Sequence, residues 1–258
     1  PSFNNPNRQV SALTSIANYY SLPSAEGSGD TSFNYPNMFI PVDRAKIVAN
    51  GVVPADMRNN VDSNIPVNLL KDQYITSKDG YTLSSAKAMQ LDIISSMVAQ
   101  GWKRPAYFAI TIPDEYYSYF ENQDGGYKFT TSAGMAYALT PINMLAYKSV
   151  GSGYTDKAYR NITEHYRWGG LDKATPGNVP YYDETAARMV NSTRISIVEA
   201  AQNLIKEAEM AADLKEHNDS LKVDVPARVM TDGFIADRYN KARTLLHLME
   251  QKLPWFAV

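Results

Sequence analysis

The fold is decided by residues 84–112, which read SSAKAMQLDIISSMVAQGWKRPAYFAITI. The first half carries apolar residues at steps of three, three and four, which is helical spacing, namely Ala88, Leu91, Ile94 and Val98. Serines that can cap this helix precede it, and Gly101 can end it. Residues 106–112 then form an apolar run that stops at Pro113, as in a strand buried on both faces. A helix, a short turn and a buried strand predict an α/β unit.

The sequence before this stretch predicts little regular structure. Residues 1–80 are rich in Asn, Pro and Ser, and the recurring prolines exclude long helices. Short extended pieces are predicted at residues 38–42 and 65–67, where proline favours an edge position. Residues 24–30 are small and polar, which predicts a mobile loop.

A second strand is predicted at residues 135–140, where large apolar residues alternate with small ones. Together the two strands predict a small mixed sheet with flanking helices. We therefore expect a first domain at residues 1–150, of α+β or α/β class, with an irregular Pro/Asn-rich N-terminal part.

The sequence after residue 153 predicts helices. An apolar residue returns every seven positions at Val190, Ile197, Leu204 and Ala211, which predicts a helix over residues 184–214 with Asp183 as its cap. A second stripe has alternating steps of four and three and comprises Ile235, Tyr239, Ala242, Leu246, Met249 and Leu253. Two such stripes are expected to pack as an antiparallel pair, as in helical-repeat proteins. This portion, residues 154–258, is the second predicted domain.

Composition excludes several classes of protein. The 258 residues contain no cysteine, which excludes disulfide scaffolds, thiolate catalysis and Cys-ligated zinc. Lys and Arg number 25 against 27 Asp and Glu, so a nucleic-acid partner is not expected. No stretch approaches the ~20 apolar residues of a membrane-spanning helix, and the chain opens on Pro1. A soluble piece of a larger protein is therefore expected.

Motifs for self-contained catalysis are missing. The sequence has neither a G-x-S-x-G nucleophile elbow nor a phosphate-binding loop. His165, His217 and His247 stand far apart, and each is expected on the surface or bonded to a neighbour rather than to a metal. We therefore predict no catalytic residue, no metal and no cofactor for this chain.

Two places carry side chains suited to binding. Tyr116 and Tyr119 lie in the densest aromatic cluster and are able to stack on sugar rings, although a core face of a short helix explains them as well. Arg167 and Trp168, with Arg160, are suited to a phosphate and a ring, as in a lipid-phosphate headgroup. The alternative is structural ion pairs with acids such as Asp156, Glu164 or Asp172.

Residues 102–105, Trp-Lys-Arg-Pro, also allow two interpretations. Lys103 and Arg104 either face lipid headgroups or complement the dipole at the end of the preceding helix, and the second interpretation is favoured. Trp102 is expected to be a core anchor.

Several segments, taken in order, resemble a known family. They are YPNMFIPVD at 35–43, VANGVVP at 48–54, LDII at 91–94, GWKRPAYFA at 101–109, GMAYALTPI at 134–142, YRWGGLD at 166–172 and YYDET at 181–185 with Arg188 and Met189. In this order they resemble the carboxy-terminal portion of the Bacteroidetes DUF2723 membrane proteins. That family is similar to protein O-mannosyltransferases of the multi-spanning glycosyltransferase type.

The resemblance implies a periplasmic domain cut from a membrane enzyme whose catalytic acids lie in an N-terminal membrane bundle outside this chain. It also implies that the helical pair is tetratricopeptide-like, although residues 206–236 depart from the family and suggest a longer charged loop. The implied function is non-catalytic: the domain would position an acceptor protein or glycan for transfer from a polyprenyl-phosphate sugar. The implied partners are the chain's own transmembrane region, the acceptor and the lipid headgroup. The alternatives are a protein–protein interaction scaffold of the cell envelope and a soluble carbohydrate-binding protein.

Overall fold

The structure is a computed structural model that describes residues 10–11, 31–33, 37–68, 81–83, 85–122, 124–173, 175 and 183–253. Contacts divide the chain into two compact units, which are described separately below. The first unit takes the chain up to Ala106 with Ile112–Thr130 and Leu139–Ala146, and the second takes Tyr107–Thr111, Thr131–Ala138 and the chain from Tyr147 onward. The second unit thus includes two segments from before residue 150, outside the predicted boundaries of 154–258.

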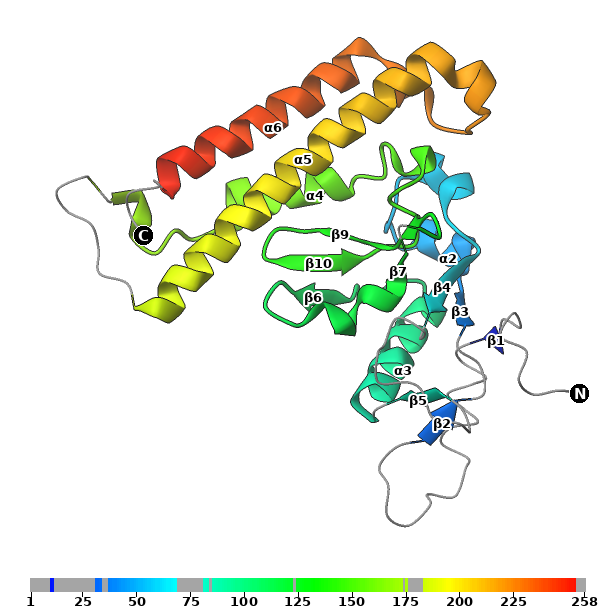
Figure 1. Ribbon diagram of the computed structural model, residues 1–258. Coiled ribbons are helices and arrows are strands. Elements are labelled where there is room, and N and C mark those ends of the chain that lie inside the picture. The colour runs from blue at the N-terminus through cyan, green and yellow to red at the C-terminus, as the bar shows by residue number, and fades with distance from the viewer. Residues whose placement is uncertain are drawn as a thin grey trace, which may run out of the picture. The chain divides into compact units, whose positions relative to one another are not determined.

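Short strands and turns build the first unit (Figure 1). Its mixed sheet has the order β1 (Val10–Ser11), β3 (Asn37–Pro41), β4 (Asn64–Asn68), with β1 parallel and β4 antiparallel to β3. Three further pieces are a ladder of β2 (Thr31–Phe33) with β5 (Tyr81–Leu83), a ladder of β7 (Glu121–Asn122) with β8 (Tyr127–Lys128), and the 3₁₀ turns η1 (Ala55–Asn60), η3 (Asp114–Tyr116) and η4 (Ser118–Phe120). The extended pieces predicted at 38–42 and 65–67 are confirmed as β3 and β4, and β4 has the predicted edge position. The edge position predicted for 38–42 is wrong, because β3 is the central strand and its proline lies at its end. The loop predicted at 24–30 lies outside the described residues.

Helix α3 (Ser85–Ala99) confirms the helical half of the deciding stretch, because Ala88, Leu91, Ile94 and Val98 are all buried. It ends at Gly101, whose φ of +71° is left-handed. The next residue, Trp102, is also left-handed at φ +58°. This turn sends the indole inward, where it is buried and its Nε1 donates to Leu139 O at 3.2 Å. The prediction that Trp102 is a core residue is confirmed.

The short helix α2 (Arg44–Ala49) lies beside the end of α3. Asp43 caps it by accepting from two backbone N–H groups. Lys46 Nζ donates to Ala99 O at 3.3 Å, and Asn50 Nδ2 donates to Gly101 O at 2.8 Å. The last carbonyls of α3 are therefore satisfied by side chains from α2.

The strand half of the deciding stretch differs from the prediction. Strand β6 covers only Tyr107–Ala109, and its side chains are alternately exposed, buried and exposed. It pairs antiparallel with β10 (Ala136–Leu139) at the edge of a sheet of order β6, β10, β9 (Thr130–Ser132). The prediction of a strand buried on both faces is wrong, because an edge strand of a small antiparallel sheet has one solvated face. The second strand, predicted at 135–140, is confirmed as β10.

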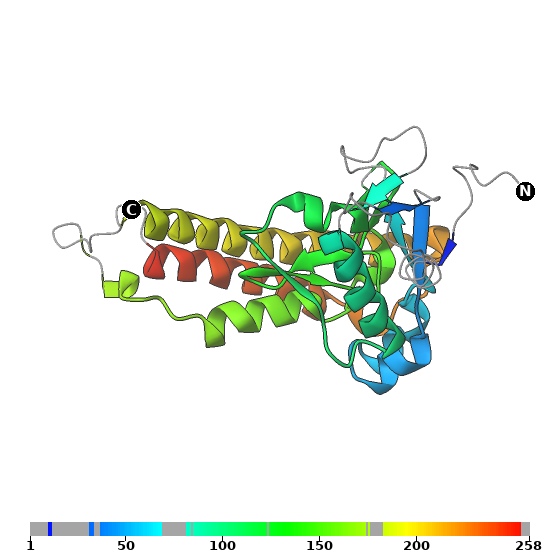
Figure 2. The ribbon, with the colours of Figure 1, turned by 90° about the horizontal axis from the view of Figure 1, so that it is seen from below.

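Helices build most of the second unit. They are α4 (Tyr154–Arg160), α5 (Glu184–Leu221) and α6 (Asp232–Lys252), with the 3₁₀ turns η5 (Tyr147–Ser149), η7 (Leu171–Lys173) and η8 (Ala227–Met230) and the π turn η6 (Asn161–His165). Helices α5 and α6 lie side by side as an antiparallel hairpin (Figures 1 and 2). The mixed α and β architecture followed by a helical hairpin is therefore confirmed.

Helix α5 is longer than predicted. Asp183 caps it as expected, by accepting from Ala186 N, and the stripe Val190, Ile197, Leu204 and Ala211 is buried. The helix continues past the predicted end to Leu221, with a kink at His217. Leu221 packs on a small cluster of Val150, Ala211, Leu214 and Val229. The longer charged loop suggested within residues 206–236 is therefore shorter than expected, because α5 reaches Leu221 and α6 begins at Asp232.

The inward stripe of α6 is partly shifted from its predicted positions. Ala242 and Leu253 are buried as predicted, but Tyr239 and Leu246 are exposed. The residues one position earlier, Arg238 and Leu245, are buried instead. Within the described residues, no helix has the length and apolarity needed to cross a bilayer.

Candidate functional site

Tyr116 and Tyr119, the first pair of predicted binding residues, lie in the first unit in consecutive 3₁₀ turns. Tyr119 is only 2% exposed and packs on Phe120, with ring centroids 4.8 Å apart. Because η4 packs on β4, this ring belongs to the core and is not accessible to a sugar. The structural interpretation is therefore the correct one for Tyr119.

Tyr116 is half-buried and has a different environment. The Lys87 ammonium of α3 lies 5.7 Å from its ring centroid, within the range of a cation–π contact. Gln90, one turn along α3, donates through Nε2 to Tyr116 O at 2.7 Å. Gln90 Oε1 is buried and accepts no hydrogen bond from a described residue. The corner formed by Lys87, Gln90 and Tyr116 thus combines an aromatic ring, a cation and a buried carbonyl oxygen that has no hydrogen-bond donor among the described residues.

Arg167 and Trp168, the second predicted pair, follow η6 in the second unit. Trp168 packs on the core that includes Ile162 and Val190, and its ring lies 5.7 Å from that of Tyr166. Its aromatic surface is therefore largely used within the fold. Arg167 is exposed and makes no ion pair with a described residue, so the predicted pairing with Asp156 is wrong.

Asp156 instead belongs to a buried ionic network that the sequence did not reveal. Arg238 of α6 has a side chain only 5% exposed and binds Asp156 of α4 with both Nη atoms, at 2.5 and 2.9 Å. The Arg238 Nε lies 3.3 Å from Glu207 Oε2 of α5, and that carboxylate is only 7% exposed. The pattern of apolar residues could not indicate this arrangement, because an inward arginine is read as a surface residue.

Both oxygens of Glu207 also accept hydrogen bonds from nearby residues. Gly151 N donates to Oε1 at 2.7 Å, and the Thr155 hydroxyl donates to Oε2. Burial raises the pKa of Glu207 above its ordinary value, although the Arg238 charge and these hydrogen bonds act in the opposite direction.

Lys241 completes the network from the next turn of α6. Its Nζ lies 2.6 Å from Asp156 Oδ1 and 2.8 Å from Asp237 Oδ2. Partial burial opposes ionisation of Asp156, but the hydrogen bonds from Arg238 and Lys241 outweigh it and lower its pKa. A network with this many internal partners holds α4, α5 and α6 together rather than awaiting a ligand.

The pKa of Asp156 gives a prediction for acid. Its folded-state pKa is below its unfolded value, so its contribution to stability is present above the unfolded pKa and is lost as pH falls through the folded pKa. Asp156→Asn should therefore destabilise the chain at about pH 7. The difference in unfolding free energy between wild type and Asp156→Asn should narrow at about pH 3, which lies below the ordinary pKa of Asp. Urea unfolding at both pH values measures this difference, and an unchanged difference would contradict this role for Asp156.

The histidines lie as expected from the sequence, on the surface or beside an acid. His217 Nδ1 is 3.0 Å from Asp213 Oδ1, and His247 Nδ1 is 3.3 Å from Glu250 Oε2. The Tyr147 hydroxyl donates to the other oxygen of Asp213, and that hydrogen bond raises the pKa of Tyr147. In the part of the chain that the structure describes, no three potential ligands gather to hold a metal ion.

A comparison with protein families gives a match to this chain. Residues 10–158, more than half of the chain, match the model of a family described as TMEM260-associated domain 2. The matched range contains the corner at Tyr116 and ends within α4, so it leaves out Arg167, Trp168 and the hairpin of α5 and α6. No curated protein and no solved structure matches the chain.

Proposed function

Because this chain belongs to the TMEM260-associated domain 2 family, we propose that it is the non-catalytic periplasmic domain of a membrane-embedded glycosyltransferase. The observation that carries the proposal is the family match, because the domain is associated with TMEM260, a membrane glycosyltransferase-like protein. The finer assignment, to DUF2723 proteins of Bacteroidetes that use a polyprenyl-phosphate sugar, rests on the ordered segments quoted above. In this function the domain presents an acceptor protein or glycan to the catalytic region.

The corner at Tyr116 is the place within the matched range best suited to an acceptor. A sugar ring or an apolar side chain of an acceptor is able to pack on the half-buried Tyr116 ring. Gln90 holds this residue in place, because its Nε2 donates to Tyr116 O. Tyr119 is a core residue and Trp168 is partly buried against the core of the second unit, so both support the fold and are not assigned to the acceptor. Arg167 remains a candidate for the phosphate of a polyprenyl-linked donor.

The Tyr116→Ala change tests this corner in cells that produce the full-length protein. Losing the aromatic face should lower O-glycan occupancy of envelope proteins about two- to tenfold, and Tyr116→Phe should retain most of it. Mass spectrometry of the glycopeptides measures occupancy, with protein abundance checked in parallel. Tyr239→Ala, an exposed tyrosine of α6 outside the matched range, is the control and should change nothing. Equal glycan occupancy in all variants would show that the acceptor does not bind at the corner of Tyr116.

The non-catalytic role has its own test. The 258-residue chain mixed with a polyprenyl-phosphate-linked sugar and an acceptor peptide should give no transfer. Robust turnover would mean that the chain holds its own catalytic centre, which contradicts the proposal.

A scaffold that docks partner proteins is the second candidate. The observation that favours it is a set of exposed large apolar residues on the hairpin, Met189, Ile195, Tyr239 and Leu246. A scaffold would retain its partners in pull-downs from envelope extract after Tyr116 and Arg167 are changed to alanine. An acceptor-positioning domain would lose them.

A further inference from the structure

Helix α3 carries an uncharged face that the first unit leaves exposed. Met89 and Ile93, one turn apart, are 61% and 67% exposed. The other exposed positions of this face and its C-terminal end are also uncharged, namely Ala86, Ser96, Ala99 and Gln100. The charged residues of the helix are Lys87, which is buried, and Asp92, which is half-buried at the flank of the face. A helix that exposes large apolar side chains in adjacent turns of an uncharged outward face is suited to being covered by a partner surface.

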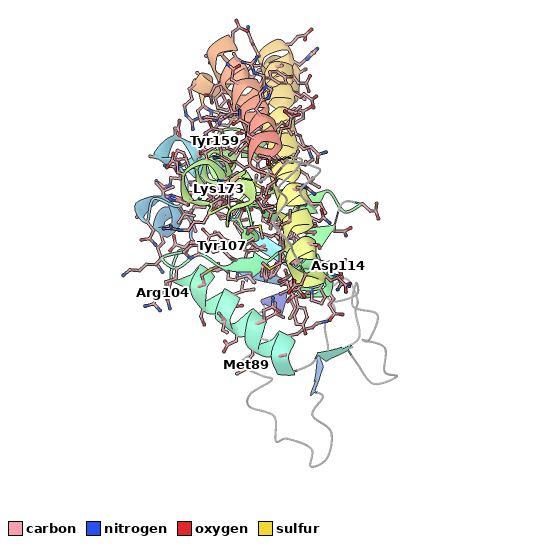
Figure 3. The ribbon with its side chains drawn as sticks, turned by 90° about the vertical axis from the view of Figure 1, so that its left-hand side faces the viewer. Met89, Arg104, Tyr107, Asp114, Tyr159 and Lys173 are labelled. Carbon is pink, nitrogen blue, oxygen red and sulfur yellow. The ribbon has the colours of Figure 1, made fainter. Side chains whose placement is uncertain are left out.

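Exposed cations lie just beyond the end of this face. Lys103 and Arg104 follow α3 directly, and neither makes a hydrogen bond or ion pair with a described residue. Figure 3 shows Met89 beside the first turns of α3 and Arg104 just beyond its last turn. The local role expected for these cations was to complement the dipole at the end of α3, where Lys46 Nζ also donates to Ala99 O. That role needs no hydrogen bond, so it leaves both side chains able to reach a partner outside the chain.

Helix α2 adds positive charge at the same place. It lies against the end of α3 through Lys46 and Asn50 and also carries the exposed Arg44. The acid beside these cations is Asp43, whose Oδ2 lies 3.6 Å from Lys46 Nζ. The neighbouring turn η1 contributes one exposed acid and one exposed base, Asp56 and Arg58, and so no net charge. Four cations against two acids, Asp43 and the flanking Asp92, leave an excess of two positive charges beside this face.

We infer that this surface, the outward face of α3 with Arg44, Lys46, Lys103 and Arg104, docks onto an anionic lipid bilayer. Met and Ile side chains enter the boundary between headgroups and acyl chains, while long basic side chains reach the phosphates. A negatively charged leaflet attracts clustered cations over about one Debye length, which makes the contact sensitive to salt. The inference concerns how the chain meets a bilayer and does not depend on glycosyl transfer.

Vesicle sedimentation of the 258-residue chain tests the inference. The chain should bind vesicles of phosphatidylglycerol and phosphatidylcholine, bind vesicles of phosphatidylcholine alone much more weakly, and release from the anionic vesicles as salt is raised. Equal binding to both kinds of vesicle, or no binding to either, would overturn the inference.

Matched variants locate the contact on α3. K103Q/R104Q should weaken binding to the anionic vesicles about 25-fold, since each cation near such a surface contributes about fivefold. M89S/I93S should weaken it about tenfold, because two apolar side chains no longer enter the interface. The control M189S/I195S changes the same residue types on α5, where they are 52% and 61% exposed, and should leave binding unchanged.

Thermal unfolding should be unaltered by these changes, because all the replaced side chains are exposed. Equal losses in M89S/I93S and M189S/I195S would overturn the placement on α3. Absence of vesicle binding together with reduced glycan occupancy in Tyr116→Ala would reject this inference alone and leave the proposed function standing.

Discussion

Changing Arg238 to alanine is expected to destabilise the second unit by about 3–5 kcal/mol, the largest effect of any single substitution in the network. The guanidinium is the only group that contacts both Glu207 and Asp156 among the residues described. Without it, a carboxylate that is 7% exposed loses its nearest positive charge. Urea unfolding, followed by circular dichroism of the helices, measures the loss.

Two comparisons make the Arg238 experiment decisive. Arg243→Ala removes an exposed arginine from the same helix and should change stability by less than about 0.5 kcal/mol. Arg238→Ala combined with Glu207→Ala should lose less than the sum of the two single changes, because the second change removes the charge that the first leaves unpaired. A loss for Arg238→Ala no greater than that of Arg243→Ala would show that the network does not hold the helices together.

The second large effect is expected at Trp102. Truncation to alanine should destabilise the first unit by about 3–5 kcal/mol, since it empties a buried site and removes the donor to Leu139 O. Trp102→Phe retains much of the ring volume and loses only the N–H group, so it should fall between wild type and alanine. The measurement is the urea midpoint.

Lys103→Ala is the matched control for Trp102, because the neighbouring side chain is exposed. It should leave the urea midpoint unchanged while weakening binding to anionic vesicles. If Trp102→Ala unfolded no more readily than Lys103→Ala, the indole would not be the anchor of the turn after α3.

How far the sequence predicts this fold depends on what kind of pattern each element carries. The stripe Val190, Ile197, Leu204 and Ala211 repeats without interruption, and it placed the start, the cap and the inward face of α5 correctly, although not its end. The prediction that β6 is buried on both faces was wrong, because a run of apolar residues indicates a strand without showing how many of its faces are covered. On α6, hydrophobicity selected Tyr239 and Leu246, whereas packing against α5 selected Arg238 and Leu245.

The candidate site shows that residue type alone does not identify binding residues either. Residue type alone drew attention to Tyr119 and Trp168, but aromatic rings are as useful to a core as to a sugar. Gln90 was missed because its importance comes from one unbonded oxygen, which only the three-dimensional arrangement reveals. Arg238, Glu207 and Asp156 were missed because they are about 50 and 30 residues apart, and no spacing rule joins charges at such separations.

The network joins a part of the chain that matches the family model to a part that lies outside the match. Asp156 lies within the range shared with the family, whereas Arg238 and Lys241 lie outside it. The match to the family model therefore ends within α4, whereas the packed structure continues from α4 into α5 and α6. A polypeptide shortened to residue 158 would expose the buried side of α4 and leave Asp156 without its two cations. Family members that lack the hairpin should then carry a different residue in place of Asp156, so that the two features appear and disappear together during evolution.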